Sequence, residues 1–159
     1  MKLRIGYGFD VHRLADGHSL FIGGVKVPSE FGAVGHSDAD VLLHAVCDAL
    51  LGALSLRDIG YHFSDTDPAF KGIDSKILLE RVFSMIKEKG YAVNNIDTTV
   101  VLEKPKLSSY IPEMQKVIST LLEVSEDCVS VKATTHETVD SFGEKRAIKA
   151  YACCLLIKK

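Results

Sequence analysis

The sequence lacks the features of membrane, secreted and disulfide-rich proteins. Its longest apolar runs, such as ACCLLI, fall far short of the ~20 residues that a membrane-spanning helix needs. The N-terminus has neither the apolar core nor the cleavage site of a secretory signal. The four cysteines are Cys47, Cys128, Cys153 and Cys154. They form no C-x-x-C pair, which favours free thiols in a reducing compartment. We therefore expect a soluble, cytoplasmic protein without a membrane partner.

An excess of positive charge is also lacking. The 19 Lys and Arg residues stand against 21 Asp and Glu residues, which gives a formal net charge of -2. This balance excludes a nucleic-acid binder that depends on non-specific attraction to phosphate. Small anionic ligands remain compatible with it, because local groups hold them. Internal repeats and linker-like segments are absent too, so the 159 residues predict a single domain over 1–159 that can bury a core.

What the sequence does contain begins with a patterned segment, IGYGFDVHRL. Apolar residues alternate with others there, and a period of two predicts a half-buried strand. Residues i and i+2 of a strand point the same way, so Asp10 and His12 would lie side by side. Gly6 and Gly8 share that face and leave room for another group to approach the backbone.

The remaining elements alternate between strands and helices. SLFIGGVKVP predicts a β-hairpin, and NIDTTVVLE, CVSVKATT and AIKAYACCLLI predict three further strands. Apolar residues spaced three and four apart predict helices over 41–54, 75–89 and 111–124. We expect Ser37 to be the N-cap of the first helix and residues 55–74 to form a loop. Together, the elements predict an α+β fold, with a mixed β-sheet that carries helices on one face.

Asp10, His12 and His44 are candidate ligands of one metal ion. One carboxylate and two imidazoles suit a divalent metal such as Zn²⁺ and leave a position open for substrate. The pattern also allows a structural alternative, in which His44 is a core histidine hydrogen-bonded to Asp40 or Asp48 on the same helix face. Asp48 is equally a candidate for orienting a metal-bound imidazole.

Three further motifs have both a binding and a structural interpretation. In GHSDAD, His36 directly precedes a helix N-terminus, which can favour phosphate although many capped helices bind nothing. In the loop RDIGYHFSDTDPAFKG, the acids can bind hydroxyls or a cation, or can be simply solvated. In KATTHE, the threonines and Glu137 can converge on a polyphosphate with Mg²⁺ on Glu137, but threonines also favour sheets. The histidines expected at the surface without a function are His18 and His62.

Taken together, these segments resemble the 2-C-methyl-D-erythritol 2,4-cyclodiphosphate synthase family of the non-mevalonate isoprenoid pathway. The resemblance covers nearly the whole chain and is carried, in the family's order and spacing, by GYGFDVHRL, IGGVKVP, HSDADVLLHAVCDALLGAL, DIGYHFSDTDPAFKG, EKPKL and KATTHE. It implies a two-layer α+β sandwich. It also implies a homotrimer whose active sites lie between neighbouring subunits.

The resemblance implies a phosphorus-oxygen lyase. In the family reaction, the 2-phosphate of 4-diphosphocytidyl-2-C-methyl-D-erythritol 2-phosphate attacks the β-phosphorus, CMP leaves, and 2-C-methyl-D-erythritol 2,4-cyclodiphosphate forms. The implied cofactors are Zn²⁺ on Asp10, His12 and His44, and Mg²⁺ (or Mn²⁺) on Glu137. The metal-bound residues Asp10, His12 and Glu137 would also contact the substrate.

The resemblance also implies roles for further residues. His36, Thr135 and Asp58 are the implied catalytic residues, the first two through stabilisation of the transition state. Asp58 would also bind the methylerythritol unit. The remaining implied substrate contacts are Ser37 beside a phosphate, Ile59 and Gly60 at the methylerythritol unit, Phe63, Asp65 and Asp67 in a flap, and Leu102, Lys106, Ala133 and Thr134 in a cytidine pocket.

The chain departs from many bacterial family members after KATTHE. Ser141 and Glu144 stand where a phenylalanine and an arginine are common, and the version here is similar to that of plant-like members. A plastid location after removal of a transit peptide therefore stays open. Two other functions stay open as well, a metal-dependent phosphohydrolase and a non-catalytic, metal-stabilised trimeric binding module.

Overall fold

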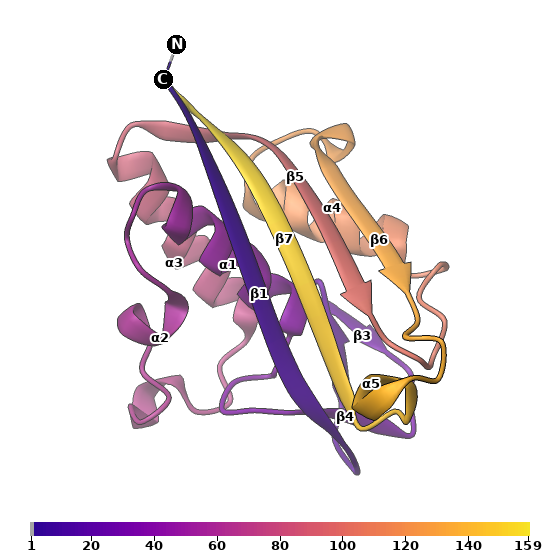
Figure 1. Ribbon diagram of the computed structural model, residues 1–159. Helices are drawn as coiled ribbons and strands as arrows, with labels where there is room; N and C mark the ends of the chain where they lie inside the picture. Colours follow the sequence, from indigo (N-terminus) through magenta and orange to yellow (C-terminus); the bar gives the residue numbers. More distant parts are fainter. Residues whose placement is uncertain (1) are drawn as a thin grey trace.

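A mixed β-sheet and several helices make up the chain, whose residues 2–159 are described by a computed structural model (Figure 1). The strands are β1 (Leu3–Asp16), β2 (Leu20–Ile22), β3 (Val25–Val27), β4 (Phe31–Val34), β5 (Tyr91–Val101), β6 (Val129–Thr134) and β7 (Ala147–Lys158). The helices are α1 (Val41–Ala53), α2 (Ile59–His62), α3 (Ser75–Glu88), α4 (Ile111–Leu121) and α5 (Asp140–Gly143), with 3-10 turns η1 (Pro68–Phe70) and η2 (Glu126–Cys128). The predicted α+β class is confirmed.

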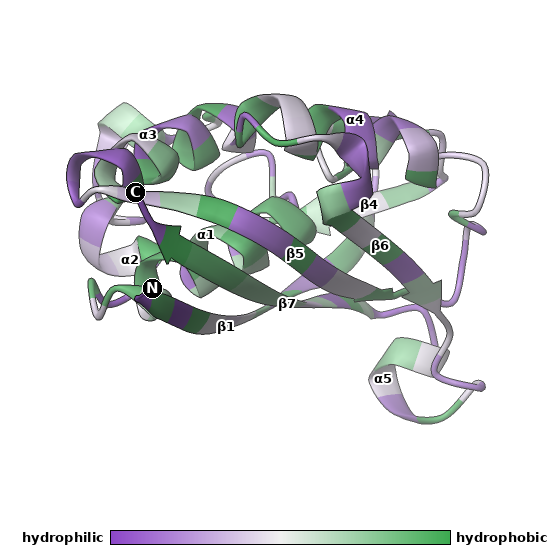
Figure 2. Cartoon of the chain, turned by 90° about the horizontal axis from the view of Figure 1, so that it is seen from above, coloured by the Kyte–Doolittle hydropathy of each residue, from purple (hydrophilic) through white to green (hydrophobic). Residues whose placement is uncertain are grey.

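Five strands form the main sheet, in the order β4-β1-β7-β5-β6. Only β5 and β6 pair in parallel, so the sheet is mixed, as predicted. The predicted hairpin is also present, as the separate two-stranded sheet β2-β3. Helices α1, α3 and α4 lie on one side of the main sheet, and α5 lies beyond its other side (Figure 2). Among residues 2–159, no helix has the length and apolar character needed to cross a membrane.

The glycine face of β1 is the face that the chain buries. A Cβ atom on Gly8 would lie 1.9 Å from the carbonyl oxygen of Ala45, and one on Gly6 would lie 1.8 Å from that of Ala49. Helix α1 therefore packs directly on the β1 backbone, the close approach that the glycines were predicted to allow. The alternating side chains that point the other way and are exposed are Leu3, Ile5, Tyr7, Phe9 and Val11.

Helix α1 begins at Val41, as the apolar spacing predicts, but its N-cap is Asp40 rather than Ser37. The Asp40 carboxylate accepts hydrogen bonds from the backbone N–H groups of Leu42 and Leu43 at 3.1 and 3.0 Å. It also accepts from the N–H groups of Gly23 and Gly24, at 2.9 and 2.6 Å. One buried carboxylate thus joins the hairpin turn to the start of α1, which a cap at Ser37 would not do.

Other element boundaries are close to the predicted ones. Helix α3 starts after the Asp74 cap and is followed by Gly90 at φ 77°, whereas α4 ends three residues before the predicted limit at residue 124. The prediction of a loop over residues 55–74 is wrong in part. It contains α2 and η1, whose N-caps Asp58 and Asp67 accept from Tyr61 and Ala69. Strand β4 was not predicted, since four residues carry too little periodicity.

Candidate active site

Three metal-ligating side chains meet where α1 crosses β1. The Asp10 Oδ2 atom lies 2.9 Å from both His12 Nε2 and His44 Nδ1, and these two nitrogens are 3.2 Å apart. The three side chains are partly or largely buried, with 24%, 17% and 8% of their surfaces exposed. One carboxylate and two imidazoles aimed at one point form the only metal-ligating group of three found within residues 2–159. These donors fit Zn²⁺.

The triad is strongly coupled electrostatically. Burial works against ionisation of Asp10, but hydrogen bonds from His12 and His44 outweigh it and lower the pKa of Asp10 to about 2. Burial likewise opposes the charged form of His44, yet the Asp10 carboxylate raises the pKa of His44 above its usual value. The Asp10 carboxylate thus favours positive charge beside it. A divalent cation bound to the three side chains would supply that charge.

Neither predicted helix-face partner bonds to the imidazole of His44 through its carboxylate. Asp40 caps α1, as described above, and Asp48 accepts the backbone N–H of Ile59 at 2.8 Å. The second ring nitrogen of His44, Nε2, instead lies 2.9 Å from Ser75 Oγ and 3.1 Å from Ser37 Oγ. The alternative of a core histidine bonded to Asp40 or Asp48 is therefore wrong, as is the assignment of Asp48 to orienting the imidazole.

A cavity of about 380 Å³ opens beside the triad. The residues from the predicted site that line it, besides the triad itself, are His36, Ser37, Ile59, Gly60, Phe63 and Asp65. Asp58 does not line it, because its carboxylate accepts the N–H of Tyr61 at 2.9 Å. An apolar wall made by Phe70, Ile73 and Leu78 was not predicted. In the sequence, these residues are only isolated apolar positions, two in the acidic loop and one in the helix that follows it.

The structure also bears on the anion site predicted at the start of α1 and on the positions of His36 and Asp67. The N–H groups of Leu42 and Leu43 in the first turn of α1 donate to the Asp40 carboxylate, so these two donors are not available to the anion that was expected there. His36 lies in the preceding loop, with its Nε2 atom 3.3 Å from the carbonyl oxygen of Asp67. The Asp67 carboxylate itself caps η1 and does not line the cavity.

A second cavity, of about 230 Å³, lies between the end of β5, the start of α4 and the end of β6. It is lined by the predicted cytidine-pocket residues Leu102, Lys106, Ala133 and Thr134, and by Thr135. Ile111, which was not predicted, adds an apolar contact from α4. Glu137 is close to this cavity, because Thr135 Oγ1 donates to Glu137 Oε1 at 3.2 Å. The two cavities share no lining residue.

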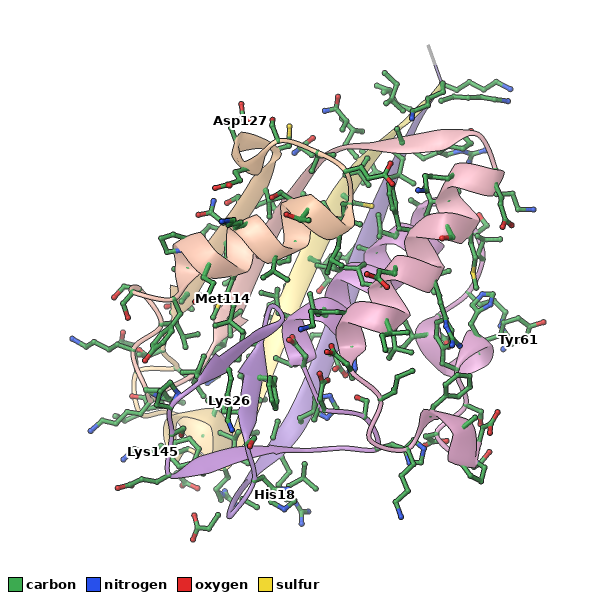
Figure 3. All side chains as sticks on the ribbon, turned by 180° about the vertical axis from the view of Figure 1, so that it is seen from behind. His18, Lys26, Tyr61, Met114, Asp127 and Lys145 are labelled. Atoms are coloured by element: carbon green, nitrogen blue, oxygen red, sulfur yellow. The ribbon has the colours of Figure 1, made fainter. Side chains whose placement is uncertain are left out.

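The two histidines expected at the surface lie outside both cavities. Figure 3 shows His18 on the turn after β1, where it is exposed. His62, at the end of α2, bonds through Nε2 to the carbonyl oxygen of Leu56 at 2.8 Å. Its neighbour Tyr61 projects outward (Figure 3) and stacks against Arg57, whose guanidinium carbon is 4.2 Å from the ring centre.

Comparison with known proteins identifies the family of the chain. The model of the YgbB family matches residues 3–157. The chain belongs to the YgbB family. A 2-C-methyl-D-erythritol 2,4-cyclodiphosphate synthase of Porphyromonas gingivalis is 54% identical over 154 residues, which are 97% of this chain and 95% of that protein. The synthase of Phocaeicola vulgatus is 55% identical over 158 residues, 99% of each chain.

Solved structures that superpose on this chain are also 2-C-methyl-D-erythritol 2,4-cyclodiphosphate synthases. A 2C-methyl-D-erythritol-2,4-cyclodiphosphate synthase superposes with a TM-score of 0.90 and 36% identity, over 97% of this chain and 100% of that one. The CDP complex of IspF from Plasmodium falciparum gives a TM-score of 0.87 and 37% identity, over 99% of this chain and 97% of that one. The bifunctional IspDF of Campylobacter jejuni superposes with a TM-score of 0.95 and 36% identity. The match covers 99% of this chain but only 43% of that protein. The YgbB membership confirms the family resemblance seen in the sequence.

Proposed function

We propose that this chain converts 4-diphosphocytidyl-2-C-methyl-D-erythritol 2-phosphate into 2-C-methyl-D-erythritol 2,4-cyclodiphosphate and CMP. It is a phosphorus-oxygen lyase of isoprenoid biosynthesis, as are the synthases that share about half of its residues over nearly their whole length. The observation that carries the proposal is the Asp10, His12 and His44 cluster at the wall of a cavity. All four cysteines are free, which agrees with a cytoplasmic location.

The reaction needs positioning and charge neutralisation more than it needs a nucleophile in the protein. The attacking 2-phosphate is already an anion, so no serine or cysteine has to be activated. Zn²⁺ on Asp10, His12 and His44 would supply a positive charge that orients and polarises the β-phosphate. His36 and Ser37 line the same cavity and offer hydrogen bonds to phosphate oxygens.

The other substrate contacts are assigned to the loop after α1 and to the second cavity. Ile59 and Gly60, with Asp58 beside them, would hold the methylerythritol hydroxyls, while Phe63 and Asp65 line the cavity. Asp67 follows them in the same loop as part of the flap that the resemblance implies. The cytidine would enter the cavity lined by Leu102, Lys106, Ala133 and Thr134, in keeping with the CDP held by IspF of Plasmodium falciparum. Thr135 and Glu137, with Mg²⁺ or Mn²⁺ on the carboxylate, would hold the diphosphate.

We assign a homotrimer to this chain, in which the exposed apolar face of β1 lies between subunits. Leu3, Phe9 and Val11 are 43–46% exposed, Tyr7 is 61% exposed and Ile5 is 76% exposed. A row of large apolar side chains along one strand is the kind of patch that marks an interface. No segment of residues 2–159 covers it, since the helices α1, α3 and α4 lie on the opposite side of the sheet (Figure 2).

A trimer also accounts for the separation of the two cavities. The triad and the cytidine-type cavity share no lining residue within one chain, although one substrate has to reach both. An active site shared between neighbours would place the metal of one subunit beside the cytidine pocket of the next. This arrangement is the same as that implied by the sequence resemblance.

One assay tests the proposed function against its alternatives. The purified protein is given the cytidine-containing substrate with and without a zinc chelator, and both CMP and the phosphorylated products are measured. The synthase releases CMP together with the cyclic diphosphate, and the chelator abolishes both. Linear phosphates would instead identify the metal-dependent phosphohydrolase. An absence of turnover, with normal behaviour of Asp58 and Glu137 variants, would identify the non-catalytic binding module.

A further inference from the structure

The His44 imidazole makes contacts through both of its ring nitrogens, one inside the triad and one outside it. Its Nδ1 atom points at Asp10 and His12, whereas its Nε2 atom lies 2.9 Å from the Oγ atom of Ser75. Ser75 is the first residue of α3 and is fully buried. Helix α3 thus places the buried hydroxyl of Ser75 against the imidazole of His44, although α3 supplies none of the three metal-ligating side chains.

Ser75 is held in turn by Asp38, in the loop before α1. The Ser75 hydroxyl donates a hydrogen bond to Asp38 Oδ1, and the backbone N–H of Ser75 donates to Asp38 Oδ2 at 3.0 Å. Asp38 Oδ1 also accepts the N–H of Asp40 at 3.2 Å, and the Asp38 N–H donates to the carbonyl oxygen of Ile73 at 3.1 Å. The carboxylate is thus fixed by both of its oxygens and by its own backbone.

The chemistry of these groups gives the chain of hydrogen bonds a direction. An ionised carboxylate only accepts, so the hydroxyl proton of Ser75 points at Asp38. The remaining lone pairs of Ser75 Oγ face His44, whose Nε2 atom must then carry a proton. When the ring is neutral, a histidine with its proton on Nε2 has a lone pair on Nδ1, the nitrogen that faces Asp10 and His12 and that would bind a metal ion.

We propose that Asp38 and Ser75 are positioning residues of the metal centre. The chain Asp38–Ser75–His44 fixes the imidazole in the tautomer that binds Zn²⁺ and makes its Nδ1 atom a stronger ligand, because a negative charge lies behind the bridging hydroxyl. This role deepens the proposed function, since it assumes that the triad binds Zn²⁺. It also explains why α1 and α3 must be held together at their N-terminal ends.

Ser37 does not duplicate this role. Its Oγ atom lies 3.1 Å from His44 Nε2, and it accepts the N–H of Ala39 at 3.1 Å. None of the hydrogen bonds within residues 2–159 joins Ser37 to a carboxylate, and its side chain is only half buried. Ser37 can therefore accept the imidazole proton, but it does not place a charge behind the ring.

The test is the affinity for zinc, measured by competition with a chromophoric chelator. Ser75→Ala should weaken zinc binding by about 10- to 100-fold, the usual effect of removing a group that orients a metal ligand. Ser119→Ala is the matched control, because Ser119 is also buried and its hydroxyl donates to the carbonyl oxygen of Lys116 on α4, away from the triad. The control should bind zinc as the unmodified protein does.

A spectroscopic signature separates positioning from a loss of structure. In the zinc-loaded protein, the proton on His44 Nε2 should give an exchange-protected imidazole signal in a proton–nitrogen correlation spectrum. The signal should shift and lose protection from exchange in Ser75→Ala, where only the half-buried Ser37 hydroxyl is left to accept the proton, and it should be unchanged in Ser119→Ala. Asp38→Asn keeps the size of the side chain and removes its charge, so it should weaken zinc binding even if Ser75→Ala does not fold.

Zinc affinities of both Ser75→Ala and Asp38→Asn within twofold of the unmodified protein would overturn the proposal, as would an unchanged His44 signal in Ser75→Ala. The outcome is independent of turnover. If the unmodified protein binds zinc but forms no cyclic product, the proposed reaction fails while the positioning role is still measured. If it binds no zinc, both fail, and the chelator titration shows this directly.

Discussion

At the scale of single residues, His44 is the ligand whose loss should be most specific. It supplies one of the three donor atoms, and its side chain is 8% exposed. His44→Ala should remove bound zinc and CMP release while the protein stays folded, because the backbone of α1 does not depend on the imidazole. Metal analysis of the purified variant measures this, with His18→Ala as the control on an exposed turn. Full zinc occupancy in His44→Ala would exclude His44 as a ligand.

Asp58 requires a more careful substitution, because the structure gives it a capping role that the sequence did not. Its carboxylate accepts the N–H of Tyr61 at the start of α2. Asp58→Ala would therefore loosen α2 in addition to removing a substrate contact. Asp58→Asn keeps a good capping group and removes only the charge.

We expect both Asp58 variants to bind zinc normally and to lose turnover, with Asp58→Asn melting at the temperature of the unmodified protein. Steady-state kinetics and thermal unfolding measure the two effects separately. If Asp58→Asn turns over normally, the Asp58 carboxylate is a cap and not a substrate contact.

How far the site could be predicted differs from residue to residue. Asp10 and His12 share a strand face by simple alternation, and the sequence motifs placed His44 beside them. The partner of His44 could not be found in this way. Helical spacing pointed to Asp40 and Asp48, but the hydroxyl comes from Ser75, 31 residues away on another helix. Only tertiary packing of α1 against α3 brings it there.

At the scale of elements, the contact between α1 and β1 positions the metal centre. Gly8 gives α1 room to lie on the strand backbone, with the Ala45 carbonyl only 1.9 Å from where a Cβ atom would be. Ala45 is the neighbour of His44, so a displacement of α1 at this point would move the imidazole away from Asp10. The geometry of the triad thus depends on Gly8, which is not itself a metal ligand.

Gly8→Ala should lower the free energy of unfolding by about 1–3 kcal/mol, the usual cost of overpacking, and should weaken zinc binding. Gly52→Ala is the matched control in α1, because its Cβ atom would meet only the Tyr7 carbonyl oxygen, at 3.8 Å. That control should be neutral or up to about 1 kcal/mol more stable, since alanine favours a helix. Denaturant unfolding and zinc titration measure both, and equal behaviour of the two variants would contradict this role of Gly8.

Long elements were predictable from the sequence, whereas short elements and the capping residue of α1 were not. The helices α1 and α3 and the long strands have enough repeats of their period to be recognised. Strand β4 and helix α2 each have four residues, too few for a period to show. The N-cap of α1 was misassigned because Ser37 and Asp40 are both good caps, and only the hairpin turn at Gly23 and Gly24 selects Asp40.

At the scale of the whole molecule, alternation along β1 was read correctly as a strand, but it could not tell which face one chain buries. The chain covers the glycine face and leaves the apolar face exposed. An apolar residue in a sequence looks the same whether its own chain or another copy covers it. The aromatic side chains on this face do contact one another, with Phe9 and Tyr151 at 5.2 Å between ring centres. They form a continuous surface across β1 and β7.

Ile5→Lys tests whether that surface joins subunits. Ile5 is 76% exposed in one chain, so a lysine there is solvated in a monomer and costs the fold little, but between subunits it would bury an unpaired charge. We expect light scattering to show a fall from the mass of a trimer to that of a monomer. Zinc should still bind, because all three ligands come from one chain, whereas CMP release should be lost because the cytidine cavity of a neighbour is no longer beside the metal. Ile77→Lys, at a 41% exposed apolar position on α3, is the control and should leave mass and turnover unchanged. A monomeric variant with full turnover would show that one chain holds the whole active site.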